Sequence, residues 1–280
     1  MEIGGDMISR IVAATALTAL AALASANPGN AADLSVAPMY RAPPPPPAPV
    51  YNWTGCYVGG GGGYAMWTQN SFVTAPNGTP VTASQSNGGN GWFGQGQVGC
   101  DYQFRLPLFS FLSPEVVIGA FGDYAGGSIQ GSNSFPGGPG FTGQEKESST
   151  WAVGGRAGVL VSPRFLTYFD GGFTQARFDG VNYNFAFAGG GPSGLSLSSQ
   201  NYNGWFLGSG FEYAFDWLPI PGLFLKTEYR YSQYGGNGVS VPLTGSVGGV
   251  PVPAGTALNS QKATQFVSTE LVYRFNWFGR

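Results

Sequence analysis

The sequence predicts an all-β protein: an eight-stranded antiparallel transmembrane β-barrel with short periplasmic turns and long outer loops. Three observations support this prediction. Strand-like segments place apolar and charged side chains on opposite faces, connections alternate between short and long, and only 9% of the 280 residues are charged. A soluble sandwich turns its charged faces to water, whereas an outer-membrane barrel turns apolar faces to lipid and encloses polar ones. The shortage of charge favours the barrel, because about 25% of residues in soluble proteins are charged.

Residues 1–32 are predicted to be a signal peptide. Arg10 precedes an apolar run over residues 11–23, and small residues follow as far as Ala32. The run is too short to cross a bilayer, which argues against the alternative of a retained signal anchor. Residues 33–51 contain consecutive prolines at 43–47 and are predicted to be an extended periplasmic leader. This leader is interpreted as a disordered segment, and a contact with the cell wall is the functional alternative.

Residues 52–280 are predicted to form the barrel itself. Its strands are expected at residues 54–67, 91–104, 115–124, 150–161, 165–178, 203–215, 223–234 and 263–277. Each segment provides the roughly 9–11 residues that a tilted membrane strand needs. Alternation is clearest in the last two segments, and the first is too rich in glycine for its faces to be assigned.

The segment at 223–234 illustrates the alternation. Leu225 and Tyr229 fall on one face, and Lys226, Glu228 and Arg230 fall on the other. Successive side chains of a strand point to opposite faces, so this strand has one apolar and one ionic surface.

The connections between these segments alternate in length. Those at 105–114, 162–164 and 216–222 are short or contain proline, as is typical of periplasmic turns. The connections on the other side are long and rich in Gly, Ser, Asn and Pro, and they cover residues 68–90, 125–149, 179–202 and 235–262. Soluble domains seldom carry four long unstructured loops, whereas outer-membrane barrels do so on their outer side. These loops are expected to face the surroundings of the cell, where a surface ligand would meet them.

The charged faces predict a network of side chains inside the barrel. The residues expected to point inward are Asp101, Glu115, Asp123, Arg156, Asp170, Glu212, Lys226, Glu228, Arg230, Glu270 and Arg274. Eight strands enclose a lumen that side chains can fill, so we expect these groups to pair across it as a structural network. A narrow passive pore for small solutes, lined by the same charges, is the alternative.

Aromatic residues gather near the ends of the predicted strands. Examples are Trp53, Tyr57, Trp67, Trp92, Tyr102, Trp151, Tyr234 and Tyr273. Rings with one apolar and one polar end prefer the headgroup zone of a bilayer, so two aromatic girdles are expected.

Cys56 and Cys100 are the two cysteines of the chain. If Trp67 lies opposite Gly89 in an antiparallel pair, Cys56 lies opposite Cys100. The periplasm is oxidising, so we predict a cross-strand disulfide, with two lipid-facing thiols as the alternative. Their spacing fits no metal motif.

Composition argues against several other classes of protein. The chain contains no His, which removes the usual metal ligand and general base, so no enzyme, catalytic residue, cofactor or metal site is predicted. The formal net charge is −2 and no basic cluster stands out, so nucleic acid is not an expected partner. Glycines at 59–63 lack the Lys-Ser or Lys-Thr pair of a phosphate-binding loop. A soluble secreted β-sandwich remains an alternative.

Several segments resemble a known family. The proline run and the sequence Tyr51-Asn52-Trp53-Thr54-Gly55-Cys56-Tyr57-Val58-Gly59-Gly60 resemble the start of small α-proteobacterial outer-membrane barrels. These are porin-family or outer-membrane immunogenic proteins, akin to opacity and OmpA-like eight-stranded barrels. Segments 211–215, 225–231 and 272–277 resemble the family's last three strands.

The resemblance implies a location more than an activity. It places the chain in the outer membrane, surrounded by lipid, with a structural or surface-interaction role and no catalytic residues. The C-terminus departs from the family, because Gly279 and Arg280 follow the terminal aromatic pair.

Overall fold

The computed structural model describes residues 51–107, 114–137, 140–187, 189–215, 220–247 and 250–275. The predicted signal peptide and all of the predicted leader except Tyr51 lie outside these residues. A contact between the leader and the cell wall therefore stays a prediction. In the described part, no helix has the length and apolar character that a membrane span requires.

The described residues are almost entirely β-structure. The strands are β1 (Gly55–Thr74), β2 (Gln85–Arg105), β3 (Glu115–Ser134), β4 (Phe141–Ser162), β5 (Phe165–Phe178), β6 (Val181–Phe185), β7 (Pro192–Leu197), β8 (Gln200–Ala214), β9 (Leu223–Val247), β10 (Val250–Pro251) and β11 (Ala257–Phe275).

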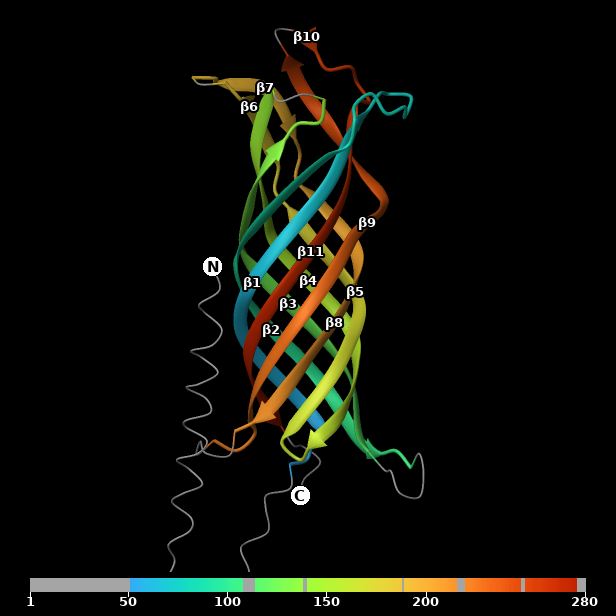
Figure 1. Cartoon of the computed structure of the whole chain (residues 1–280), viewed down its shortest axis with the longest axis vertical. Helices are drawn as coiled ribbons and strands as arrows, with labels where there is room; N and C mark the ends of the chain where they lie inside the picture. The colour runs from blue at the N-terminus through green and yellow to red at the C-terminus, as the bar shows by residue number, and fades with distance from the viewer. Residues whose placement is uncertain are drawn as a thin grey trace, which may run out of the picture. The chain divides into compact units, whose positions relative to one another are not determined.

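Eight of these strands form a closed antiparallel barrel, which confirms the predicted fold class. The order around the wall is β11-β1-β2-β3-β4-β5-β8-β9, and pairing between β9 and β11 closes the ring. Figure 1 shows the tilted strands wrapping around one interior, with β6, β7 and β10 at the upper end. Closure leaves the wall without an unpaired edge strand, and it rules out the soluble sandwich.

The wall continues upward beyond β5 and β8. β5 ends at Phe178 and β8 begins at Gln200, and the β6–β7 hairpin takes their place between β4 and β9. Phe141 of β4 pairs with Phe185 of β6, and Leu195 of β7 pairs with Gly245 of β9. The outer connections are long, as predicted, but most of their residues extend the strands instead of forming irregular loops. Backbone groups of these Gly-rich and Ser-rich stretches are thereby satisfied by neighbouring strands.

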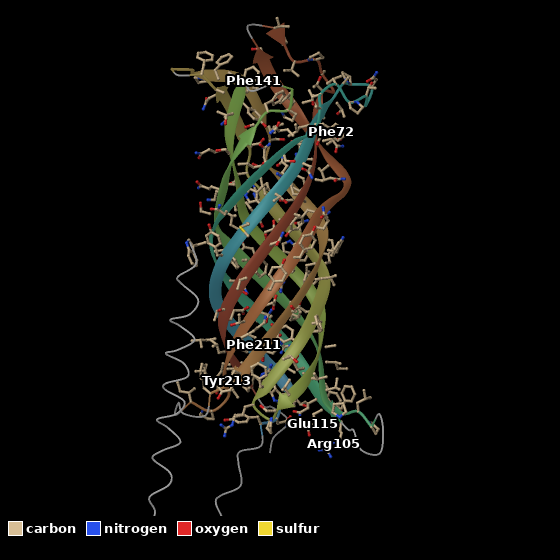
Figure 2. All side chains as sticks on the ribbon, viewed as in Figure 1. Phe72, Arg105, Glu115, Phe141, Phe211 and Tyr213 are labelled. Atoms are coloured by element: carbon tan, nitrogen blue, oxygen red, sulfur yellow. A yellow bond between two sulfur atoms is a disulfide. The ribbon has the colours of Figure 1, made fainter. Side chains whose placement is uncertain are left out.

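Exposed aromatic rings divide the wall into two segments. Trp92, Trp151 and Trp205 face outward partway up the wall, and Tyr102 and Tyr273 face outward near its lower end. We call the wall between these two sets of rings the membrane segment. The wall above the three tryptophans is called the outer segment. Figure 2 places Arg105 and Glu115 at the lower end of the barrel and Phe141 at the upper end.

Not all of the predicted girdle residues face outward. Trp53, Tyr57, Trp67 and Tyr234 are each 1% exposed or less and point into the barrel. The register puts them on the inward face, where Trp67 donates its Nε1–H to the carbonyl oxygen of Ile129 at 3.2 Å. The prediction was wrong about the side on which they lie, and Trp67 and Tyr234 also lie well inside β1 and β9, because these strands continue beyond their predicted ends.

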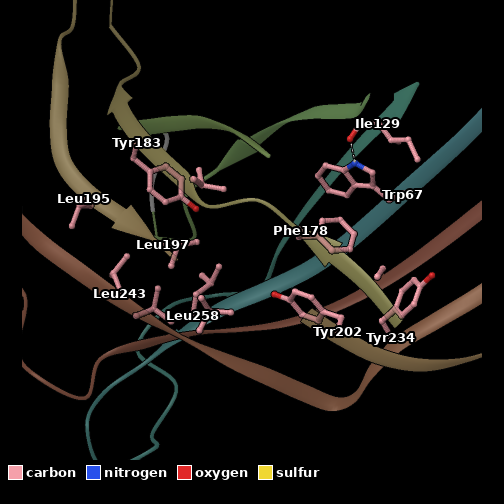
Figure 3. Close-up of a cluster of buried hydrophobic side chains, with 14 of the residues drawn as sticks. Trp67, Ile129, Phe178, Tyr183, Leu195, Leu197, Tyr202, Tyr234, Leu243 and Leu258 are labelled. Carbon is pink, nitrogen blue, oxygen red and sulfur yellow. Dashed lines mark hydrogen bonds between the residues drawn. The ribbon is translucent and has the colours of Figure 1, made fainter. Parts of the chain in front are cut away.

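The interior contains two clusters of buried apolar side chains. The lower cluster includes Trp53, Leu166 and Phe224 and lies in the membrane segment. The upper cluster lies in the outer segment, and Figure 3 shows the rings and aliphatic side chains that converge there from the wall. Its aromatic members are Trp67, Phe93, Phe178, Tyr183, Tyr202 and Tyr234.

Candidate functional site

The buried charges of the lumen form three tiers, which together are the candidate site. The lower tier consists of Asp101, Arg156, Glu212 and Arg274, from β2, β4, β8 and β11. Arg156 pairs with Glu212 at 2.6 Å (Nη1 to Oε1) and binds both carboxylate oxygens of Asp101. Arg274 pairs with Asp101 at 2.6 Å (Nη1 to Oδ2) and also with Glu212. The two arginines and two carboxylates thus form a closed ring of ion pairs across the lumen.

Ion pairs and aromatic rings surround most of the buried charge in this ring. All four side chains are 2% exposed or less. The Arg156 guanidinium lies 4.7 Å from the ring centre of Tyr57, and that of Arg274 lies 4.8 Å from the ring centre of Trp53. Charges removed from water are tolerated when ion pairs, hydrogen bonds and aromatic faces replace the lost hydration. The lower tier is therefore a self-compensated structural unit.

The middle tier connects β3, β9 and β11. Lys226 pairs with Glu228 at 2.7 Å (Nζ to Oε2) and with Glu270 at 3.4 Å (Nζ to Oε1). Arg230 pairs with Glu228 at 2.7 Å (Nη2 to Oε1) and with Asp123 at 2.8 Å (Nη1 to Oδ2). Lys226, Glu228 and Arg230 are alternate residues of one strand, as the period of two predicted.

Uncharged side chains complete the middle tier. Gln97 accepts a hydrogen bond from Lys226 Nζ at 2.8 Å, and the Tyr168 hydroxyl donates to Glu228 Oε2 at 3.0 Å. Gln95 donates to Glu270. The ring centre of Phe206 lies 4.3 Å from the Arg230 guanidinium. The tier therefore spans the lumen without an open passage at its centre.

Asp170 is buried in the lumen but forms no ion pair in the lower or the middle tier. It is 5% exposed, and neither carboxylate oxygen accepts a hydrogen bond from any described residue. Glycine at position 208 leaves room for it, because a Cβ there would collide with Asp170 Oδ1. The sequence predicted its inward direction, and the structure places it without the cationic partner that we expected.

The upper tier was not predicted, and it lies in the outer segment. Lys262 pairs with Glu145 at 2.6 Å (Nζ to Oε1), and Glu147 accepts hydrogen bonds from Thr150 at 2.6 Å and from Thr264 at 3.0 Å. Burial raises the pKa of Glu147 and lowers the pKa of Lys262, because it disfavours the charged form of each. Glu145 and Glu147 alternate with outward residues, and this pattern could have predicted a strand with an inward ionic face. The surrounding sequence is rich in Gly and Ser, however, which is typical of a loop.

Glu115 differs from the other predicted network residues. It is the first residue of β3, at the lower rim, where it pairs with Arg105 at 3.1 Å with side chains 39% and 69% exposed. Glu115 is at an inward position of β3, as predicted. Its side chain is nevertheless exposed to solvent, because it lies at the end of the strand. Glu115 is therefore not part of the buried network.

Cys56 and Cys100 are joined in a disulfide. They are directly opposite in the β1–β2 register, where Trp67 also lies opposite Gly89. Both cysteines lie on the exposed outward face of the membrane segment. The bond therefore cross-links neighbouring strands of the wall, outside the lumen.

Two small cavities lie among the buried side chains of the described lumen. One cavity of 20 Å³ lies between the middle and upper tiers and is lined by Asp123, Arg230, Glu147 and Thr264 among others. A second, of 10 Å³, lies beside Glu145. Holding one water molecule takes about 10–15 Å³, so these cavities hold isolated waters and not a continuous column. Among the described residues, no group of three or more His, Cys, Asp or Glu side chains could hold a metal ion.

The closed barrel with aromatic rings at two levels, an apolar outer face and an ionic lumen defines an outer-membrane β-barrel. The chain is 30% identical over 213 residues to the 31 kDa outer-membrane immunogenic proteins of Brucella melitensis biotype 1 and Brucella suis biovar 1, an alignment that covers 73% of this chain and 80% of each relative. The chain belongs to this family of outer-membrane immunogenic proteins and lies in the outer membrane. No family model matches the chain.

Three solved structures to which the chain has detectable similarity are Ail, OprG and OmpT. Ail of Yersinia pestis is 12% identical, with a TM-score of 0.28 and coverage of 76% of this chain and 99% of Ail. OprG of Pseudomonas aeruginosa is 12% identical, with a TM-score of 0.34 and coverage of 79% and 97%. The outer-membrane protease OmpT of Escherichia coli is 11% identical, with a TM-score of 0.41 and coverage of 79% and 97%.

Proposed function

We propose that this protein is a non-conducting barrel that anchors and presents its outer segment at the cell surface. The closed lumen is the observation that supports this proposal most directly. An ion on its way through would have to break the buried ion pairs of the lower and middle tiers in the membrane segment. It would then meet the apolar cluster around Trp67, Phe178 and Tyr202 in the outer segment. The two cavities beside these groups, of 20 and 10 Å³, are too small to hydrate an ion at either step.

The outer segment has the surface of a hydrogen-bonding ligand platform. Residues 68–90 and 233–261 contain no Asp, Glu, Lys or Arg, and their outward positions are occupied mainly by Ser, Thr, Asn, Gln and Gly. A surface of this kind makes contacts through hydrogen bonds and shape more than through long-range electrostatic attraction. The relatives are named as immunogenic proteins, which supports exposure of the corresponding surface here.

A non-catalytic role is part of the same proposal. General acid–base catalysis needs a side chain that can reach a substrate. The lumen carboxylates, in contrast, are buried and most are engaged by cations within the barrel. The chain also lacks His, the most common general base.

Single-channel recording of the full chain in a planar bilayer tests the proposal, after heat-modifiable migration on a gel has shown that the barrel is folded. We expect no stable conductance steps. Arg230→Gln and Glu270→Gln alter the lumen, and Arg105→Gln at the lower rim is the matched control. Reproducible steps in the unmodified protein that change with Arg230→Gln or Glu270→Gln, but not with Arg105→Gln, would overturn the proposal in favour of a narrow pore.

A further inference from the structure

The few exposed charges of the outer segment lie together on one part of the wall. Within its described residues, the charged side chains that are not buried are Lys146, Arg177 and Asp179. Arg177 of β5 lies opposite Ser149 of β4, and the Asp179 backbone N–H donates to the carbonyl oxygen of Lys146 at 2.9 Å. Three charges from neighbouring strands thus meet on a surface that otherwise carries almost none.

The two cations of this group have no internal partner. Neither Lys146 nor Arg177 forms an ion pair or a side-chain hydrogen bond with a described residue. Every lumen cation, in contrast, is held by at least one carboxylate. With Asp179 as the one exposed carboxylate beside them, the group has a net charge of +1. An anion outside the barrel is therefore the partner that these cations fit.

The surface beneath the cations changes from apolar to polar in the direction of the outer end. Trp151 and Phe173 face outward with ring centres 5.5 Å apart. Trp151 Nε1 donates to Gln175 Oε1 at 3.1 Å, and Gln175 Nε2 donates to Asn203 Oδ1 at 2.6 Å. Arg177 lies two outward positions above Phe173 along the same strand, past Gln175, which is about 10 Å at the rise and tilt of barrel strands.

We propose that Lys146 and Arg177 bind the anionic phosphate headgroup of an outer-leaflet lipid whose acyl chains pack on Trp151 and Phe173. The order of rings, amides and cations matches the order of acyl chain, polar linkage and phosphate in such a lipid. Aromatic rings mark the boundary of the hydrocarbon layer, and Lys and Arg extend their apolar stems to place charge in the adjacent headgroup layer. At this height the wall is in contact with headgroups, which selects a lipid over a soluble anion. This inference does not depend on whether the lumen conducts.

Native mass spectrometry of the folded full chain in a neutral detergent tests this site, with titration of phosphatidylglycerol and, separately, phosphatidylcholine. We expect the unmodified protein to retain the anionic lipid preferentially. Removal of one cation near an anionic headgroup should weaken binding roughly fivefold, so Lys146→Gln with Arg177→Gln should weaken it roughly 25-fold and leave phosphatidylcholine unaffected. The charge-conserving pair Lys146→Arg with Arg177→Lys should retain most of the binding.

Arg105→Gln is the matched control, because it also removes an exposed cation but at the opposite end of the barrel. The proposal would be overturned if Arg105→Gln weakened phosphatidylglycerol binding as much as Lys146→Gln with Arg177→Gln does. It would also be overturned if the latter pair left this binding unchanged. Competition by inorganic phosphate at the same concentration as the lipid would also overturn it, because the site would then bind a free anion. Heat-modifiable migration of each variant separates lost binding from lost folding.

Discussion

The membrane segment and the outer segment are built from largely the same strands but have opposite patterns. In the membrane segment, Val98, Phe169 and Leu207 face outward, and the lower and middle tiers of charges lie inside beside the lower apolar cluster. In the outer segment, polar residues such as Asn70 and Gln130 face outward, and the interior is mainly apolar. A period of two therefore identifies a strand but not which of its faces is inside. The surrounding medium decides that, because lipid accepts the apolar face and water accepts the polar one.

The buried lower tier offers the largest test of this difference. Glu212→Gln removes one carboxylate that holds both Arg156 and Arg274. Removing one partner of a buried pair leaves uncompensated charge, so the free energy of unfolding should fall by about 3–5 kcal/mol. Urea unfolding of the barrel refolded in lipid vesicles measures this change.

Glu115→Gln is the matched control for that test, since it breaks the exposed pair with Arg105 at the rim. Its effect should be about 0–1 kcal/mol, as for other surface ion pairs. If the two substitutions lowered the free energy of unfolding equally, the contribution of the lower tier to stability would not depend on its burial.

A second test places the same charge on the outward face of each segment. Phe169→Arg puts a cation against lipid in the membrane segment, where Phe169 is 76% exposed, and should cost about 2–4 kcal/mol. Thr68→Arg puts it at an exposed position of β1 in the outer segment, outside the hydrocarbon layer, and should change the free energy of unfolding by less than about 0.5 kcal/mol. Unfolding in vesicles measures both, and a comparable cost at the two positions would remove the distinction between the segments.

The smallest expected effect concerns the charge that is buried in the outer segment. Burial raises the pKa of Glu147, so the folded state holds this proton more tightly than the unfolded chain does. The contribution of Glu147 to stability is therefore greatest at low pH, and it is lost as the pH rises through the two pKa values. Glu147→Gln should remove this dependence and leave the variant the more stable protein at neutral pH.

The difference in unfolding free energy between the wild type and Glu147→Gln, measured from pH 4 to pH 9, tests this prediction. Thr264→Val is the companion variant, because it removes a hydrogen bond to Glu147 without removing the charge. A difference that does not change with pH would show that Glu147 is not destabilised by its burial.

Most of the wall was predictable from the sequence, because it repeats one local rule. The alternation of Leu225 and Tyr229 with Lys226, Glu228 and Arg230 predicted both the strand and its ionic face. Sequence patterns did not show how far each strand continues. Residues 125–149 lack the strong apolar alternation of a membrane strand, so Glu145 and Glu147 were assigned to a loop.

The local sequence determined the strands, their ionic faces and the membrane environment, because alternation and charge content are properties of neighbouring residues. The tertiary structure alone decided which charges meet, and it left Asp170 without a cation while Asp101 has two. It also turned Trp53 and Trp67 inward and joined Lys262 to Glu145 across the outer segment. These outcomes depend on the register and closure of the whole barrel, which bring together residues that are far apart in the chain.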